Sequence, residues 1–504
     1  MTDVNASGDA RATGGVGLRR ELRIWEALGL SIGLASPTLA MSFSGVGAAG
    51  LVGRAVPLAF LFGGIVLLFI ASGMVIVSRN YAHAGSVYGL TGATIGPRAG
   101  FFSGWALAGC YLVFCPSAFA AAGYFVALFL HDTSIWPGAT DGFSFVWFSL
   151  AFALLCWALN LAHVRNLTRT MLSIEGVSVT LLVIVIVVIF VRLGVGHSPN
   201  SQATFSLAVL SPQIGGIHGI ALASVFAFLA FAGFEGAMSL GEETHAPTRT
   251  IPRALIVATV GIAVFYFITM IAEAMGFGAT LRGGNNFAGS SGPLFQLAHS
   301  YVAAPMGWAL ELGAAVSAFG SALASSAGCA RLIYAISRDA RPSSSLASVT
   351  KHASVPGAAL AIVMIFAIVS VFVLAVVGNS GLDIWNYLGT TGTLLILVAY
   401  ALVNAGAVRH LVVNRTTENV VAVIGPGLAV LFVLFILFNE LYPAPAAPYN
   451  VFPYLDLAWL VVGLLIVLLV PGLAKRIGQG LSAQEGLIAG ARSNRASSEG
   501  TGEA

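Results

Sequence analysis

Residues 216–251 read GIHGIALASVFAFLAFAGFEGAMSLGEETHAPTRTI, and this stretch determines the architecture of the whole chain. It begins as an apolar run long enough to enter a lipid bilayer. The small residues Ala230, Ala232 and Gly233 then interrupt the run, and the acid Glu235 follows at membrane depth. An acid at the centre of a membrane helix costs at least about 2.5 kcal/mol, so it normally marks a binding site or a pathway. Interrupted backbone persists at that depth only where it lines a cavity inside the protein.

The composition of the chain excludes a soluble fold. Of its 504 residues, 58% are hydrophobic and only 9% are charged, whereas a soluble domain is about 25% charged. A chain this apolar cannot cover itself with polar surface in water. We therefore predict an all-α protein that crosses the lipid bilayer many times and has no nucleic-acid partner.

No sequence pattern supports metal, cofactor or enzyme chemistry. The four cysteines lie in apolar runs and none belongs to a C-x-x-C pair, so we interpret them as small packing residues. A G-x-S-x-G motif begins at Gly29 and a G-x-G-x-x-G motif begins at Gly45. Neither has the strand context that its chemistry requires. We expect no metal, no cofactor and no enzymatic activity.

Twelve apolar runs are long enough to cross a bilayer, whose hydrocarbon core of about 30 Å needs about 20 helical residues. Polar tails at 1–23 and 474–504 flank this membrane domain, which occupies residues 24–473. The predicted spans are 24–45, 55–78, 100–130, 143–163, 170–193, 216–241, 252–278, 305–337, 356–378, 384–405, 419–441 and 455–473.

The distribution of basic residues predicts the orientation in the membrane. Lys and Arg are enriched in cytoplasmic loops. If both ends of the chain lie on one side, that side holds all but four of the 23 basic residues. The exceptions are Arg54, Arg192 and Arg282 on the opposite side and Arg331 within a span. We therefore expect a multi-pass protein of the cell membrane with both termini in the cytoplasm.

The first span carries an interruption that matches the one in the sixth. Its middle reads Ala35-Ser36-Pro37-Thr38, and proline removes a backbone donor and clashes with the preceding turn. The two interruptions lie five spans apart. Interrupted segments at corresponding positions of two halves point to the binding site of an inverted-repeat transporter. The N-terminus of a half-helix favours a carboxylate, and exposed carbonyl groups favour an ammonium group, so an α-amino acid suits such a site.

Three blocks of sequence resemble the amino acid–polyamine–organocation (APC) superfamily, in its amino-acid permease branch. Residues 83–105 read HAGSVYGLTGATIGPRAGFFSGW, residues 226–254 read FAFLAFAGFEGAMSLGEETHAPTRTIPRA, and residues 330–342 read ARLIYAISRDARP. They follow one another in the family's order, and the resemblance extends over about residues 20–475.

The resemblance implies a fold of the leucine-transporter type that alternates access to a site at the membrane midplane. Its 12 transmembrane helices would form a five-plus-five inverted repeat, at about 24–193 and 216–405, with two extra helices at about 419–473. In the family, the first break captures the substrate's carboxylate and the second presents backbone near its amino group. The corresponding residues here are Ser36, Pro37 and Thr38 in the first break and Phe231, Ala232 and Gly233 in the second.

Two departures from the family pattern concern the substrate and the coupling ion. Ser36-Pro37-Thr38 replaces the usual Gly-Ser/Ala-Gly triplet, so one carboxylate-binding N–H is missing. The substrate's carboxylate is then held differently, or the substrate has none. Some proton-coupled relatives carry a lysine in the fifth span, and the nearest position here is Ser178.

Carboxylates at membrane level are the candidates for coupling and gating. The resemblance links Glu235 to proton coupling or gating, and Glu175, Glu273 and Glu311 are further acids in predicted spans. We favour Glu235 and Glu175. A proton is preferred to sodium as the coupling ion because serines in a membrane helix, such as those of the eighth span, usually bond back to their own helix. A cytoplasmic gate of ion pairs is predicted from Glu242, Glu243, Arg249, Arg253, Arg338 and Asp339.

These observations predict a secondary transporter of amino acids, driven by protons or working by exchange. Apolar residues around the breaks, among them Leu34, Phe228, Phe231 and Phe234, suggest a substrate with a neutral or apolar side chain. The first alternative is a permease of the same fold for polyamines or other organic cations. The second is a membrane nutrient sensor that binds its ligand without transporting it.

Overall fold

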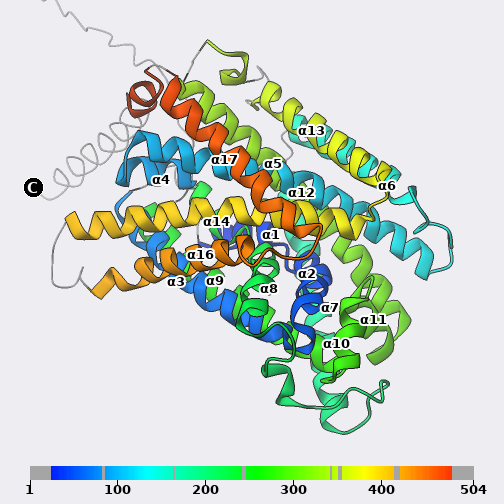
Figure 1. Ribbon diagram of the computed structural model, residues 1–504. Helices are drawn as coiled ribbons and strands as arrows, with labels where there is room; N and C mark the ends of the chain where they lie inside the picture. Colours follow the sequence, from blue (N-terminus) through cyan, green and yellow to red (C-terminus); the bar gives the residue numbers. More distant parts are fainter. Residues whose placement is uncertain are drawn as a thin grey trace, which may run out of the picture.

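The computed structural model describes residues 24–81, 86–162, 165–240, 244, 246–340, 343–349, 355–413, 421–470 and 472–479. The regular elements in these ranges are all helices, as expected (Figure 1). Those of the first half are α1 Ile24–Ala35, α2 Pro37–Val52, η1 Gly53–Ala55, α3 Val56–Asn80, α4 Ser86–Thr94, α5 Pro97–Asp132, α6 Ser144–Ala162, α7 Arg165–Gly194, η2 Leu207–Leu210, α8 Gly216–Phe231 and η3 Phe234–Leu240.

The second half of the described chain is also helical throughout its regular elements. They are α9 Pro247–Phe277, α10 Leu281–Ala288, α11 Pro293–Tyr301, α12 Ala304–Ala340, η4 Ser345–Ala347, α13 Gly357–Val376, α14 Gly381–Val413, α16 Ile424–Leu441, η5 Tyr449–Val451 and α17 Phe452–Leu469.

Each of the twelve predicted spans contains a helix, although the described part of the chain has ten stretches that meet the length and hydropathy expected of a membrane span. One of the ten, Ala27–Arg79, runs through the first two predicted spans because no long loop separates α2 from α3. The sixth predicted span is the shorter helix Gly216–Phe231, which ends at the predicted interruption. Ten stretches are therefore found instead of twelve because the first two predicted spans count as one and the helix of the sixth is too short to count.

The two broken helices lie in the middle of the bundle. In Figure 1, α1, α2 and α8 occupy its centre, and α2 packs directly against α8. α5 packs against both α12 and α14, and α3 packs against α8 and α9. α6 and α13 lie together at one edge, where they share a second cluster of buried apolar residues with α5 and α12.

The outer helices present apolar side chains outward. On α13, for example, Ile362, Ile365 and Val369 are all about half exposed. Extensive apolar surface of this kind marks a protein that contacts membrane lipid. Together with the ten long apolar helices, it makes this chain a multi-pass membrane protein.

Candidate functional site

The first span is interrupted at a single residue. α1 ends at Ala35, Ser36 has a left-handed backbone (φ 44°, ψ 64°), and α2 begins at Pro37. Because Pro37 has no N–H, the carbonyl oxygen of Gly33 lacks its helical partner, and the Ser36 hydroxyl donates to that oxygen at 2.9 Å. The hydroxyl of Tyr266 donates to the carbonyl oxygen of Ala35 at 3.1 Å. The break is therefore built with its own hydrogen-bond partners.

The second interruption touches the first. α8 ends at Phe231, Gly233 has a φ of +103°, and η3 begins at Phe234. A Cβ atom placed on Gly233 would lie 2.6 Å from the carbonyl carbon of Leu34. The backbones of the two breaks are thus in direct contact, and only glycine allows them to approach this closely.

Glu235 lies in the first turn of η3 and is held by three hydrogen bonds. Its Oε2 accepts from the N–H of Gly233 at 3.0 Å and from the hydroxyl of Tyr400 at 2.7 Å. Its Oε1 accepts from the hydroxyl of Tyr111 at 3.3 Å. The side chain is buried. Donors from α5, α14 and the break itself orient its carboxylate, and the N-terminus of η3 also favours negative charge there.

A small cavity of about 30 Å³ lies against both breaks. It is lined from α1, α2, α5, α8, α12 and α14 by residues that include Ser36, Leu39, Tyr111, Gly233, Ser321 and Trp385. About 10–15 Å³ suffices for one water molecule, so this conformation leaves room for about two. The site is therefore closed around the breaks, and a substrate would need the surrounding helices to move apart.

Of the six residues predicted to bind substrate, three line this cavity: Ser36, Ala232 and Gly233. Pro37 and Thr38 are buried in the first turn of α2, and Phe231 stacks on Tyr266 with ring centroids 5.5 Å apart. The lining residues that sequence reasoning missed include Tyr111, Phe114 and Trp385. Each is an aromatic residue within a predicted span, and no spacing pattern distinguishes it from other aromatic residues of the core.

Glu175 reaches the first break from α7. Its Oε1 accepts a hydrogen bond from the N–H of Thr38 at 2.9 Å, and the next N–H, that of Leu39, donates to the Ser317 hydroxyl at 3.3 Å. Ser178, which lies near the lysine position of some relatives, instead donates to the carbonyl oxygen of Ile174 at 3.0 Å in its own helix. The fifth span therefore contacts the first break through an acid, Glu175, and not through the residue at the lysine position of some relatives.

The other two membrane-level acids lie apart from the breaks. Glu273 is buried in α9, and among the described residues neither of its carboxylate oxygens has a hydrogen-bond partner. Glu311 is buried near the start of α12, where it lines a second cavity. Of the serines in α12, Ser325 and Ser326 donate to carbonyl oxygens of their own helix, as expected.

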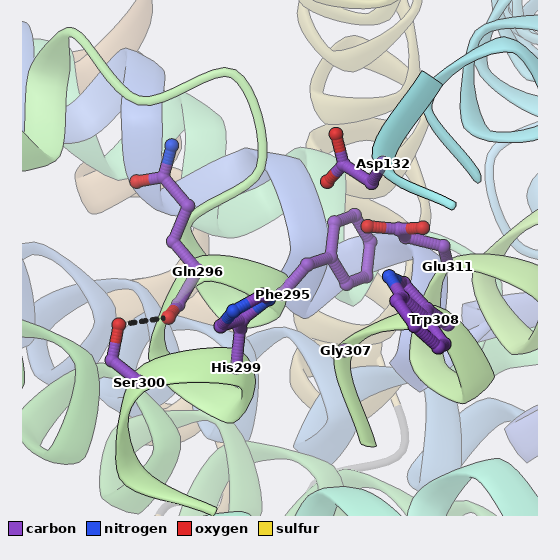
Figure 2. A pocket seen from close by; sticks show the side chains of 8 residues that line it. All are labelled: Asp132, Phe295, Gln296, His299, Ser300, Gly307, Trp308 and Glu311. Carbon is purple, nitrogen blue, oxygen red and sulfur yellow. Dashed lines mark hydrogen bonds between the residues drawn. The ribbon is translucent and has the colours of Figure 1, made fainter. Parts of the chain in front are cut away.

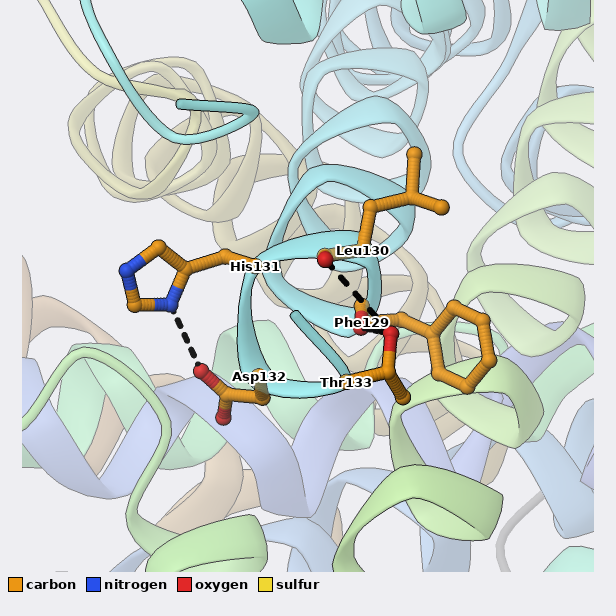
Figure 3. A network of polar contacts seen from close by, with 5 residues as sticks. All are labelled: Phe129, Leu130, His131, Asp132 and Thr133. Atoms are coloured by element: carbon orange, nitrogen blue, oxygen red, sulfur yellow. Dashed lines mark hydrogen bonds and ion pairs between the residues drawn. The ribbon is translucent and has the colours of Figure 1, made fainter. Parts of the chain in front are cut away.

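The second cavity has a volume of about 340 Å³ and lies between the ends of α5, α11 and α12. Figure 2 shows the carboxylates of Asp132 and Glu311 at this cavity, together with the rings of Phe295 and Trp308. Asp132 is also paired with His131, whose Nδ1 lies 2.8 Å from Oδ1 of Asp132 at the end of α5 (Figure 3).

A series of contacting aromatic rings lies between the two cavities. Phe295 of the second cavity contacts Phe125 edge-on, with 5.4 Å between ring centroids. Phe125 stacks on Phe43, with 4.3 Å between centroids. The ring centroid of Phe43 in turn lies 6.5 Å from that of Trp385, which lines the small cavity. We call Phe295, Phe125, Phe43 and Trp385 the aromatic column. The column runs as a series of ring contacts from the larger cavity, at Phe295, to the small cavity, at Trp385.

The predicted cytoplasmic gate is described only in part. Glu242 and Glu243 lie outside the described residues, so their pairing with Arg249 and Arg253 stays a prediction. Arg338 and Asp339 do pair, with 3.1 Å between Nε and Oδ1. Asp339 also accepts a hydrogen bond from the hydroxyl of Tyr88 at 2.9 Å, which joins α12 to α4.

The Tyr88–Asp339 contact is predicted to stabilise this end of the bundle. Burial, followed by the charge and hydrogen bond of Asp339, raises the pKa of Tyr88 far above its ordinary value, so the hydroxyl remains a donor at neutral pH. Tyr88→Phe removes a hydrogen bond to a charged group and should lower the free energy of unfolding by about 1.5–3 kcal/mol. A lower melting temperature of the purified protein would show it. Tyr442→Phe, at an exposed tyrosine, should leave that temperature unchanged.

Two discontinuous helices that meet inside a helical membrane bundle, each with a buried glutamate hydrogen-bonded to the backbone at its break, define a class of protein, the secondary transporters. A sequence model of the family described as amino acid permease matches residues 22–467. This chain belongs to the amino acid permease family, within the APC superfamily, and is a transporter and not an enzyme.

Characterised relatives differ in what their names say they carry. The chain is 30% identical over 340 residues to the low-affinity putrescine importer PlaP of Escherichia coli (strain K12), covering 65% of this chain and 69% of the importer. It is 25% identical over 472 residues to the branched-chain amino acid permease BcaP of Bacillus subtilis (strain 168), covering 91% and 95% of the two chains.

A solved structure agrees with the predicted fold. The crystal structure of MhsT in complex with L-phenylalanine matches with a TM-score of 0.56 at 15% sequence identity, covering 82% of this chain and 97% of that one. The interrupted first and sixth spans therefore belong to a leucine-transporter-type fold, as the sequence predicted.

Proposed function

We propose that this protein is a secondary transporter that moves a small organic compound with an amino group across the cell membrane, by alternating access to the two breaks. The observation that carries the proposal is the direct contact of the breaks beside the triply hydrogen-bonded carboxylate of Glu235. A protonated amine is common to the substrates named for both relatives, putrescine and branched-chain amino acids. Glu235 is suited to hold such a group.

The proposed cycle uses the rest of the site as follows. Residues 24–193 and 216–405 act as the two repeats, and both tails lie in the cytoplasm, as the distribution of basic residues indicates. A proton is the proposed coupling ion, with Glu235 and Glu175 as the acids that respond to it. The aromatic column closes the path from the external side in this conformation, and the larger cavity forms the external end of that path.

Counterflow in proteoliposomes tests the proposed function without knowledge of the coupling ion. The liposomes are preloaded with a mixture of unlabelled amino acids and polyamines, and uptake of each labelled compound is followed in turn. Accumulation of an amino compound is the expected result, and imposed pH and sodium gradients then identify the ion. Folded protein that accumulates none of these compounds would refute the proposal and favour a sensor that binds without transport.

The closure by the aromatic column predicts a change in access when one ring is removed. Ser321 lines the small cavity and the four native cysteines are buried, so Ser321→Cys introduces a thiol that reports on the site. In this background Phe43→Ala should accelerate labelling by a membrane-impermeant thiol reagent added from outside, because Phe43 links Phe125 to Trp385. The rate of labelling is the measurement.

A matched control is available at the edge of the bundle. Phe372 is about half exposed on α13, so Phe372→Ala in the same Ser321→Cys background should leave the labelling rate unchanged. Equal rates in all three proteins would show that the column does not close the path.

A further inference from the structure

The N-terminus of α2 has no N–H left for a substrate's carboxylate. A helix begins with N–H groups that lack partners within the helix, and these are the groups that bind anions. Here Pro37 has none, Thr38 donates to Glu175 at 2.9 Å and Leu39 donates to the Ser317 hydroxyl at 3.3 Å. Ala40 already donates to the carbonyl oxygen of Ser36 within the helix. Every early donor of α2 is therefore occupied by the chain itself.

The second break is capped in a similar way. The N–H of Gly233 donates to the carboxylate of Glu235 at 3.0 Å. At each break, therefore, a buried glutamate of the chain itself occupies a backbone N–H that could otherwise bind a substrate's carboxylate.

Charge around the breaks favours a cation and disfavours an acid. None of the described residues that line the small cavity is lysine or arginine, so nothing basic there offsets a substrate's carboxylate. The walls are instead apolar and aromatic, with Leu39, Phe114 and Trp385 among them. Aromatic faces attract ammonium groups, and leucine side chains suit an alkyl chain.

We propose that Glu175 is a specificity-determining residue that occupies the position of a substrate's carboxylate, so that the transported compound is an organic amine without a carboxylate. This inference rests on the proposed transport function and narrows its substrate class. An amino acid would have to displace Glu175 from Thr38 and would bring a second negative charge next to it. An amine has no carboxylate to place at Thr38, so it leaves the hydrogen bond between Glu175 and Thr38 intact.

Pairs of compounds that differ only in the carboxylate test this directly. Ornithine and putrescine are one pair, leucine and 3-methylbutylamine a second, phenylalanine and phenethylamine a third. Binding to the purified full-length protein is measured for all pairs by calorimetry, because monoamines leak through liposomes, and ornithine and putrescine are also compared by counterflow. For at least one pair we expect the amine to bind at least about tenfold more tightly than its amino acid, as expected for a charge left without a partner.

Variants of Glu175 distinguish two effects of this residue: its hydrogen bond to the Thr38 N–H and its negative charge. Glu175→Ala frees the Thr38 N–H and should raise affinity for the amino acids about tenfold or more while weakening amine binding. Glu175→Gln keeps an oxygen acceptor at Thr38 but removes the charge, so a smaller gain is expected. Ser317→Ala frees the Leu39 N–H and leaves Glu175 in the chain, so it provides a test should Glu175→Ala fail to fold. Thermal melting establishes that each variant is folded.

The outcomes distinguish this inference from the proposed function. A wild-type protein that binds or exchanges the amino acid of each pair as well as the amine would overturn the inference and leave transport of amino compounds intact. A folded Glu175→Ala protein with unchanged preference for amines would also overturn the role of Glu175. Absence of binding and of counterflow for every compound would refute the proposed function itself.

Discussion

Replacing Glu235 with glutamine is expected to reduce uptake of the substrate about a hundredfold or more. The carboxylate accepts hydrogen bonds from Gly233, Tyr400 and Tyr111. An amide offers one acceptor oxygen in place of two, so at least one buried donor loses its partner, at about 1–3 kcal/mol. The substrate's ammonium group loses its opposite charge at the same time. The lost donor contact lowers the stability of the break, whereas the lost charge weakens binding: a hydrogen bond to a charged group contributes up to about 3 kcal/mol, or about two factors of ten in affinity.

The pH dependence of the Glu235→Gln variant separates two roles for this acid. If Glu235 holds the substrate's amine, uptake should be lost at every pH, and this is the result that we expect. A variant that keeps a normal maximal rate but loses its response to pH would instead identify Glu235 as a proton carrier only.

A buried glutamate outside the site provides the control for this variant. Glu440 is buried in α16, so Glu440→Gln should keep near-normal uptake if the effect at position 235 comes from the site. Normal uptake by the Glu235→Gln variant at all pH values would contradict both roles of Glu235.

The breaks were predictable from sequence because their causes are local. Pro37 cannot donate within a helix, and Gly233 takes a backbone conformation that other residues avoid. Both effects act at the residue itself, so the structure ends α1 at Ala35 and α8 at Phe231, within a few residues of the expected positions. The order of the spans followed in the same way, because hydrophobic length is a property of contiguous sequence. The described part of the chain has ten stretches that meet the length and hydropathy of a membrane span, against the twelve predicted.

The partners of the breaks were not predictable because they come from distant helices. Glu175 meets Thr38 across 137 residues of sequence, and Tyr400 meets Glu235 across 165. We favour Glu175 as an acid that responds to a proton, but the sequence does not predict its hydrogen bond to Thr38; Glu273 is also buried and makes no hydrogen bond within the described part of the chain. Only the packing of α7 against the first break shows that Glu175 occupies a donor.

The direction of a side chain also depends on packing. Phe231 directly precedes the second break, yet its ring stacks on Tyr266 and does not line the small cavity. Ala232 and Gly233, the next two residues, do line it. Successive residues at the end of a helix point in different directions, so one of them can line the cavity while its neighbour packs into the core. The sequence alone does not determine which residue does which.

Gly233→Ala should abolish transport by separating the two breaks. The new Cβ atom would lie 2.6 Å from the carbonyl carbon of Leu34 and 2.7 Å from the nitrogen of Ala35. Both are backbone atoms, which cannot rotate away as a flexible side chain would. The φ of +103° adds strain of about 1–3 kcal/mol for a residue with a side chain. Loss of uptake, with a lower melting temperature of the purified protein, is the expected result.

Gly261→Ala is the matched control for this substitution. Gly261 lies on the exposed face of α9, where an added Cβ atom would meet nothing within 4 Å. Alanine is better than glycine inside a helix by about 1 kcal/mol, so this variant should be as stable as the wild type or more so, with normal uptake. Because both variants carry the same Gly-to-Ala change, a difference in uptake between them comes from the position of the glycine. If Gly233→Ala transported normally, close contact between the breaks would not be needed for the cycle, and the site would have to be sought elsewhere in the bundle.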